Sequence, residues 1–272
     1  MKNNILLLML VPTSLCGWSI GEVVSDTTSK VSSWFTKQQT QTSKKEYAIK
    51  TTSPITLTNH RGSVKITTWN EPTIMVDATK RGTEEEIAHT KFMVSIGGDA
   101  EKTVTIATEP RGKEKKLAAI DYALMVPRSA PVTVRTDSGN ISVQDHGANL
   151  DLQTLDGSIA IEQSAKNVKA KAPHGNITVE QNELKDDASI FLEAERDITL
   201  VMPEDANTSI NAHTTHGKII SDTIYLTLDP ITTKLNKESY KQMQQKVRGT
   251  TGAGGVPITL ESIRGNITII GE

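Results

Sequence analysis

The sequence has little cysteine, few aromatic residues and no excess of charge of either sign. Its one cysteine, Cys16, excludes a disulfide within the chain. Aromatic residues make up 4% of the 272 residues, so the core must consist mainly of small aliphatic side chains. Lysine and arginine total 30 against 32 aspartate and glutamate residues, a balance that gives no net field to attract nucleic acid. No apolar run is long enough to span a bilayer. We therefore expect neither a nucleic-acid partner nor a membrane-spanning segment.

The first residues have the layout of a secretory signal. Lys2 precedes the apolar run 5–11, and Pro12 and small or polar residues follow it. This order predicts a signal peptide at 1–17 and an extracytoplasmic location, in the periplasm, in the cell envelope or outside the cell. Lipid attachment at Cys16 is not expected, because Leu15 stands where such signals require glycine, alanine or serine.

Composition divides the rest of the chain into two parts. Residues 18–46 are rich in Ser, Thr, Gln and Lys and lack sustained periodicity, which is typical of a tether. Residues 47–272 are expected to form a single domain. Within it, 234–248 has helix-forming composition and a basic surface, so we predict a helical insertion there. Such a helix would cap the domain or contact anionic glycan or lipid headgroups.

A short phrase recurs along this domain: a turn residue, a glycine, a small polar residue, and two apolar residues flanking a polar one. Its glycines are expected to supply a positive φ or a close backbone approach in each turn. The best three copies are 18 residues apart, and in a later, imperfect copy either Arg196 or Asp197 takes the glycine position. The turn glycines are Gly62, Gly139, Gly157, Gly175, Gly217 and Gly265.

The residues around each glycine predict two short strands per repeat. Apolar residues alternate with polar ones after the glycine, as in Ile141 and Val143, and again before it, as in Val132 and Val134. Equal spacing with equivalent turns favours an all-β fold, a right-handed parallel β-helix or solenoid with coils of about 18–21 residues. An antiparallel β-sandwich is the alternative. The looser spacing of the first third predicts an irregular sheet that leads into the regular coils.

These motifs resemble the DUF4097-type bacterial putative adhesin family. The resemblance rests on GSVKITTW at Gly62–Trp69, on the serial SGNISV, DGSIAI and HGNITV turns, and on the closing stretch at Gly249–Ile269, and it extends over 47–272. It implies a single-domain β-solenoid and a role in adhesion. Its motifs consist of turn glycines and core aliphatics, so it implies no catalytic residues.

Stacked coils would align the residues that precede the glycines into one column. In sequence order this column reads Ser138, Asp156, His174, then Glu195 or Arg196, then His216. A catalytic triad is not expected, because Asp156 would separate Ser138 from His174 by two coil spacings, roughly 9–10 Å. A weaker alternative is a zinc site that uses the four acidic and imidazole side chains Asp156, His174, Glu195 and His216.

Parallel β-helices also carry polysaccharide hydrolases and lyases, which need carboxylates that face one cleft. The candidates are Asp137, Asp145, Asp151 and Asp156, although aspartate at a turn has a backbone reason of its own. We expect no catalytic, cofactor-binding or metal-binding residue. The sequence predicts an exported, non-enzymatic β-solenoid that acts as an adhesin or envelope interaction module, with a surface glycan or an envelope protein as partner. A carbohydrate-active enzyme on the same scaffold is the alternative.

Overall fold

The structure is a computed structural model that describes residues 38–98, 103–110, 116–164, 166–224, 226–228 and 244–272. Within these ranges the fold is all-β, as predicted, and its helical residues are the short helix α2 (Glu84–His89) and residues 244–245. No helix in the described ranges is long and apolar enough to cross a membrane. The predicted signal peptide, 1–17, lies outside the described residues.

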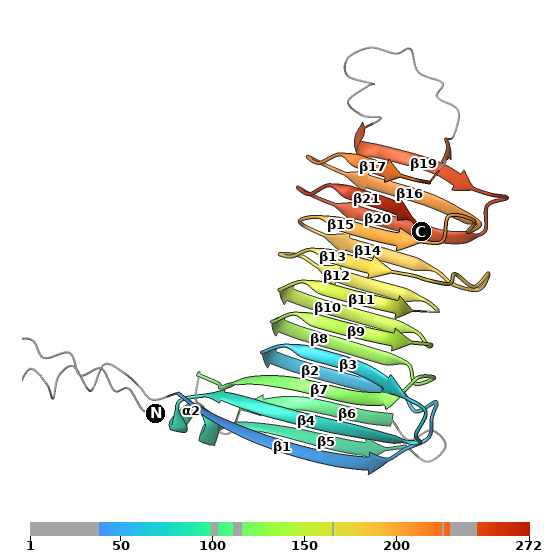
Figure 1. Ribbon diagram of the computed structural model, residues 1–272. Coiled ribbons are helices and arrows are strands. Elements are labelled where there is room, and N and C mark those ends of the chain that lie inside the picture. The colour runs from blue at the N-terminus through green and yellow to red at the C-terminus, as the bar shows by residue number, and fades with distance from the viewer. Residues whose placement is uncertain (1–37, 99–102, 111–115, 165, 225, 229–243) are drawn as a thin grey trace, which may run out of the picture. The chain divides into compact units, whose positions relative to one another are not determined.

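The strands form two mixed sheets (Figure 1). In spatial order, the first sheet contains β1 (Gln39–Ala48), β4 (Thr73–Gly82), β7 (Ala119–Pro127), β3 (Val64–Trp69), β9 (Ile141–His146), β11 (Ile159–Ser164), β13 (Ile177–Glu180), β15 (Ile198–Met202), β21 (Ile267–Gly271) and β17 (Ile219–Asp222). The second sheet contains β18 (Thr227–Leu228), β19 (Lys246–Thr251), β16 (Thr208–Thr214), β20 (Val256–Ser262), β14 (Ile190–Ala194), β12 (Val168–Ala172), β10 (Leu150–Asp156), β8 (Val132–Ser138), β2 (Ile55–Arg61), β6 (Thr103–Pro110) and β5 (Thr90–Gly97).

Each sequence repeat forms one rung, which we define as a strand of the second sheet followed by a strand of the first. Neighbouring rungs pair in parallel, so that Leu150 aligns with Val132 on one side and with Val168 on the other. Antiparallel strands are added at both ends of the stack. At one end β4 pairs with both β1 and β7, and β5 pairs with β6. At the other end β19 pairs with both β16 and β18. The regular spacing thus corresponds to parallel rungs, and the looser first third to the mixed end.

The core lies between the two sheets and is aliphatic. Alternate residues of each strand are buried, as in Ile141 and Val143 of β9 and Ile159 and Ile161 of β11. Tyr122 of β7 is the largest fully buried side chain among the described residues. Its hydroxyl lies 2.8 Å from the Thr108 hydroxyl, and burial raises its pKa to about 12. The core therefore gets its volume from stacked Ile, Val and Leu, as the low aromatic content predicted.

The rungs do not stack in sequence order. Rung β2–β3 lies between β6–β7 and β8–β9, and rung β20–β21 lies between β14–β15 and β16–β17 (Figure 1). Two short connections therefore pass another rung: residues 128–131 after β7 and residues 203–207 after β15. Sequence order alone did not predict either insertion.

Two segment boundaries differ from those expected. Part of the predicted tether, 18–46, belongs to β1, which pairs along its whole length with β4. Of the predicted helical insertion, 234–248, residues 234–243 lie outside the described residues, residues 244–245 are helical as predicted, and Lys246–Arg248 begin strand β19. The basic side chains at 246 and 248 thus extend from a strand rather than from a helix.

Candidate functional site

The turn glycines form a column in which backbone touches backbone. A Cβ on Gly157 or Gly175 would lie 2.2 Å or 1.8 Å from the carbonyl oxygen of the glycine one rung before it. Only Gly62 and Gly139, with φ of +118° and +145°, also need the left-handed region among the six predicted glycines. For Gly157, Gly175, Gly217 and Gly265, close approach is therefore the reason for glycine.

Arg196 occupies the glycine position of rung β14–β15. Its amide donates to the Gly175 carbonyl oxygen at 3.2 Å, and a Cβ on Gly265 would meet its carbonyl carbon at 2.1 Å. Of the two residues that the sequence left open, Arg196 rather than Asp197 thus continues the column. The residue before it, Glu195, then aligns with the residues that precede the glycines.

The column before the glycines differs from sequence order because of the inserted rung β20–β21. Arg264 stands between Glu195 and His216, where the sequence had placed these two side by side. The Glu195 carboxylate bridges two bases: Oε2 lies 3.0 Å from His174 Nδ1, and Oε1 lies 3.0 Å from Arg264 Nη1. The hydrogen bond from His174, then the charge of Arg264, lower the pKa of Glu195. His216 instead faces the Ile263 carbonyl oxygen at 3.1 Å.

The zinc and triad arrangements are therefore not formed. Of the four side chains proposed for zinc, only His174 and Glu195 meet, and the described part of the chain brings no three His, Cys, Asp or Glu side chains together. Asp156 pairs with Ser138 through adjacent backbones, and rung β10–β11 separates the rung of Ser138 from that of His174.

Three of the four candidate catalytic carboxylates face bases, whereas Asp156 has no ion pair among the described residues. Asp137 Oδ2 lies 2.8 Å from His60 Nδ1, and Asp145 Oδ1 lies 3.0 Å from Arg128 Nη2. Asp151 forms a two-pronged pair with Arg135, at 2.9 and 2.8 Å, and these hydrogen bonds lower its pKa. A glycosidase needs one carboxyl with a raised pKa beside a second carboxylate. Charge pairing across rungs accounts for Asp137, Asp145 and Asp151 instead.

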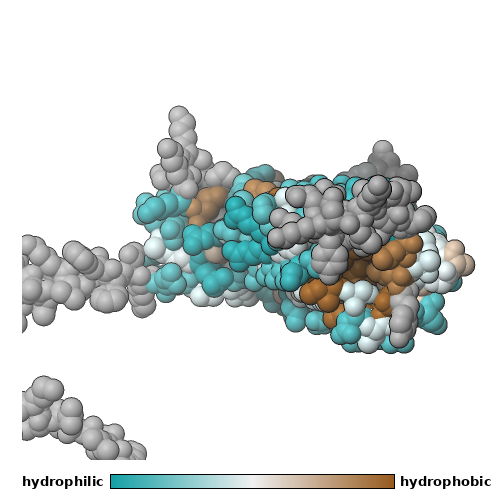
Figure 2. Space-filling view, turned by 90° about the horizontal axis from the view of Figure 1, so that it is seen from above, coloured by the Kyte–Doolittle hydropathy of each residue, from teal (hydrophilic) through white to brown (hydrophobic). Residues whose placement is uncertain are grey.

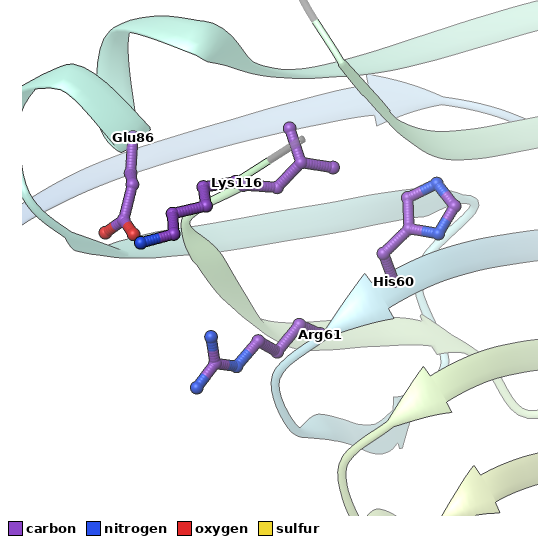
Figure 3. A pocket seen from close by; sticks show the side chains of 5 residues that line it. His60, Arg61, Glu86 and Lys116 are labelled. Carbon is purple, nitrogen blue, oxygen red and sulfur yellow. The ribbon is translucent and has the colours of Figure 1, made fainter. Parts of the chain in front are cut away.

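A recess of about 510 Å³ lies beside the end of β2 (Figure 3). It is lined by His60 and Arg61 from β2, Glu86 from α2, and Lys116 and Leu117 from the segment before β7. The Glu86 carboxylate already accepts the Thr83 amide at 2.9 Å, and His60 pairs with Asp137. Neither Arg61 nor Lys116 has an ion-pair partner among the described residues. The recess therefore combines these two cations with one carboxylate, Glu86, toward which the Lys116 amine points in Figure 3.

Sequence reasoning missed this recess. Lys116 ends a charged stretch of the sequence that carries no motif, and Arg61 is the residue before the turn glycine Gly62. The two line the same recess because rung β6–β7 is the neighbour of rung β2–β3, out of sequence order. No spacing along the chain signals such a meeting.

One titratable side chain is buried far from the recess. His146, at the end of β9, is fully buried, and burial lowers its pKa to about 4. The residue before it, Asp145, has φ of +55°, a left-handed turn that directs the next side chain inward. On the next rung Gln163 has φ of +58°, and Ser164, the Cα partner of His146, is also buried.

The end of the stack at β17 and β18 exposes apolar side chains. Ile220 of β17 is 44% exposed and Leu228 of β18 is 52% exposed. Figure 2 views this end and shows hydrophobic areas within a mainly hydrophilic surface. The described strands at this end therefore do not form a wholly polar cap.

The fold and the turn column together define an all-β stack of two-strand rungs. The Toastrack DUF4097 family matches residues 121–270, more than half of the chain, and the chain belongs to this family. The recess residues precede the matched region, whereas all turn glycines except Gly62 lie within it. The family therefore bears on the rungs rather than on the recess.

Solved structures that resemble the chain share very little sequence with it. A putative cell adhesion protein from Clostridium sporogenes is 10% identical, with a TM-score of 0.46, covering 86% of this chain and 100% of that chain. A putative adhesin from Bacteroides fragilis is 10% identical, with a TM-score of 0.29, covering 85% and 97%. A putative lipid binding protein from Parabacteroides distasonis is 8% identical, with a TM-score of 0.22, covering 84% and 96%. No curated protein matches the chain. At these scores the similarities carry no functional argument.

Proposed function

We propose that this protein is an exported, non-enzymatic interaction module of the cell envelope or cell surface, and that it binds an acidic surface glycan. One observation carries the proposal: Arg61 and Lys116 line one recess with a single carboxylate, Glu86, and neither cation forms an ion pair with a described residue. Arginine and lysine at the mouth of a recess favour a carboxylate or sulfate group as ligand. An envelope protein that offers the same groups is the other partner class.

The scaffold supports binding rather than catalysis. Three of the four aspartates expected for a hydrolase, Asp137, Asp145 and Asp151, are paired with bases, which favours a structural role for them. In this proposal the parallel rungs wind as a right-handed β-helix, in keeping with the handedness of parallel crossover connections. Polar side chains then repeat along one edge at about 4.8 Å, a spacing suited to an extended, repetitive ligand.

The test is a glycan-array assay on the mature chain, with mass spectrometry of the bound glycans in the same wells. We expect binding to acidic glycans, no cleavage, and loss of binding in the double variant Arg61→Ala, Lys116→Ala. The matched control is Lys65→Ala, which removes an exposed cation of β3 outside the recess. Equal binding by both variants would refute the recess as the site. Cleavage of any glycan would favour the enzyme, with Asp137 and Asp156 as the first residues to substitute.

A further inference from the structure

The inserted rung β20–β21 separates two rungs that could stack directly. Twenty residues separate Ile190 of β14 from Ile210 of β16, and 21 separate Ile198 of β15 from Ile219 of β17. These separations match those of rungs that do stack in order, because 18 residues join Ile159 to Ile177 and 21 join Ile177 to Ile198. The chain between β14 and β17 thus has the spacing of neighbours, although the structure places another rung between them.

The pairing register is the same on both faces of the inserted rung. In the second sheet, Ile258 aligns with Ile190 on one side and with Ile210 on the other. In the first sheet, Ile267 aligns with Ile198 and with Ile219 in the same way. If the inserted rung leaves, β14 and β15 therefore face β16 and β17 with isoleucine opposite isoleucine. A one-residue slip would turn side chains to the wrong face, and none is needed here.

The side-chain hydrogen bonds of the turn can close in the same way. The Lys218 amide donates to Asn266 Oδ1 at 3.0 Å, and the Asn266 amide donates to Asp197 Oδ1 at 2.7 Å. Asp197 and Asn266 thus play the same part on successive rungs. With the inserted rung gone, the Lys218 amide meets the acceptor Asp197 Oδ1. The glycine column also continues, because Gly217 then approaches Arg196 as Gly265 does now.

Charges on the inserted rung act in both directions. The Arg264–Glu195 ion pair, at 3.0 Å, holds it in place. On its outer face, however, Glu261 is the Cα partner of Glu193, and like charges on adjacent strands are destabilising. Glu261 also aligns with His213 on its other side, so departure of the rung would place His213 opposite Glu193. The closed stack would therefore exchange one attractive pair for relief of one repulsive pair.

The connection to the inserted rung is suited to a hinge. Residues 252–255 join β19 to β20 and include three glycines, two of them with positive φ: Gly252 at +56° and Gly254 at +75°. Glycine accepts large changes of φ and ψ without steric penalty. The connection can thus redirect the rung once the Ala253 amide releases its 2.9 Å hydrogen bond to Asn207 Oδ1.

We propose that the inserted rung is exchanged between two copies of this chain. It leaves its own stack, which can close in register for as long as the place is empty, and it enters the place between β14–β15 and β16–β17 that the rung of a second copy has left. A second copy is the fitting partner because it reproduces every contact of the rung, including the Glu195 carboxylate and the Asn266 hydrogen bonds. This is exchange of an identical element between protomers, which joins copies without new surface chemistry. The proposal is independent of any ligand in the recess.

The first test detects the rung of one copy in the stack of another. Thr199 of β15 and Thr268 of β21 are Cα partners on the outer face, so cysteines there lie within disulfide reach. Thr199→Cys and Thr268→Cys are made singly in the Cys16→Ser chain, co-expressed and oxidised with glutathione disulfide. We expect a disulfide-linked mixed dimer. The matched control co-expresses Thr178→Cys with Thr199→Cys, Cα partners that both stay in their own stack. Equal yields of mixed dimer from the two combinations, or none from either, would overturn the exchange.

The second test detects closure within one copy. Thr199 and Ile220 both align with Thr268, so they lie two rung spacings apart, about 9–10 Å, beyond the reach of a disulfide. When the stack closes, they become neighbours. We expect the double variant Thr199→Cys, Ile220→Cys in the Cys16→Ser chain to form an internal disulfide on prolonged oxidation. Adding Thr268→Cys should suppress it, because Cys at 268 captures Cys at 199 first. Free thiols at 199 and 220 after that time would contradict closure.

Discussion

Alanine at Gly175 tests whether backbone contact between turns stabilises the stack. The added Cβ would lie 1.8 Å from the Gly157 carbonyl oxygen, whereas real Cβ atoms essentially never approach within 3.0 Å. The two turns must therefore separate by about 1.2 Å, the difference between these distances. Gly175 does not have a positive φ, so the effect is free of the φ penalty that complicates Gly62 or Gly139.

The magnitude follows from the hydrogen bonds beside this contact. Ile159 donates its amide to the Asn176 carbonyl oxygen at 3.0 Å, and the Asn176 amide donates to the Ser158 hydroxyl at 3.3 Å. A separation of that size stretches both beyond hydrogen-bond range. Each is worth about 1 kcal/mol, and repacking of the turn adds a similar amount, so we expect a loss of about 2–4 kcal/mol.

Urea denaturation followed by circular dichroism measures this loss as a change in the free energy of unfolding. The matched control is Gly97→Ala at the end of β5, where a Cβ meets nothing within 4 Å. We expect that variant to keep the parent stability or gain up to about 1 kcal/mol from the unfolded chain. If Gly175→Ala and Gly97→Ala had the same free energy of unfolding, close approach would not explain the glycine column.

Two further predictions concern buried groups. Burial lowers the pKa of His146 from 6.5 to about 4. As the pH falls, the unfolded chain therefore protonates this imidazole before the folded chain does. The free energy of unfolding should drop by up to about 3 kcal/mol between pH 6.5 and pH 4. Thermal melts across that range should show the drop reduced in His146→Leu and retained in His213→Gln, an exposed histidine; equal slopes in both would contradict it. Tyr122→Phe removes the 2.8 Å hydrogen bond to the Thr108 hydroxyl, and urea titration should show a loss of about 1 kcal/mol. An unchanged midpoint would mean that this bond contributes nothing net.

The sequence predicts the content of each rung because period-two patterns act within a strand. Ile141, Ile159 and Ile177 show the inward positions directly, and the glycine offset locates each turn. Strand β1 was not predicted, because its side chains are mostly exposed on both faces. Its pairing with β4 runs through backbone groups, which leave no hydrophobic pattern in the sequence.

The order of the rungs was beyond the reach of the sequence for a different reason. Ile190 fits Ile258 and Ile210 equally well, so the apolar pattern cannot say which rung is its neighbour. The corrected place of His216 beside Arg264, and not beside Glu195, follows from this ambiguity. The recess depends on the same kind of rearrangement, since Arg61 and Lys116 come together only through rung order.

The direction of the hydrogen bonds between rungs has a mechanical consequence. Bonds such as Ile141 amide to Ser158 carbonyl and Ile159 amide to Asn176 carbonyl run from one rung to the next, along the stacking direction. A pull along this direction loads one row of bonds at a time and peels rungs apart in succession at low force. A pull across the stack, parallel to the strands, shears the whole row together and meets much greater resistance. We therefore expect a low unfolding force for a pull along the stacking direction and a high unfolding force for a pull parallel to the strands.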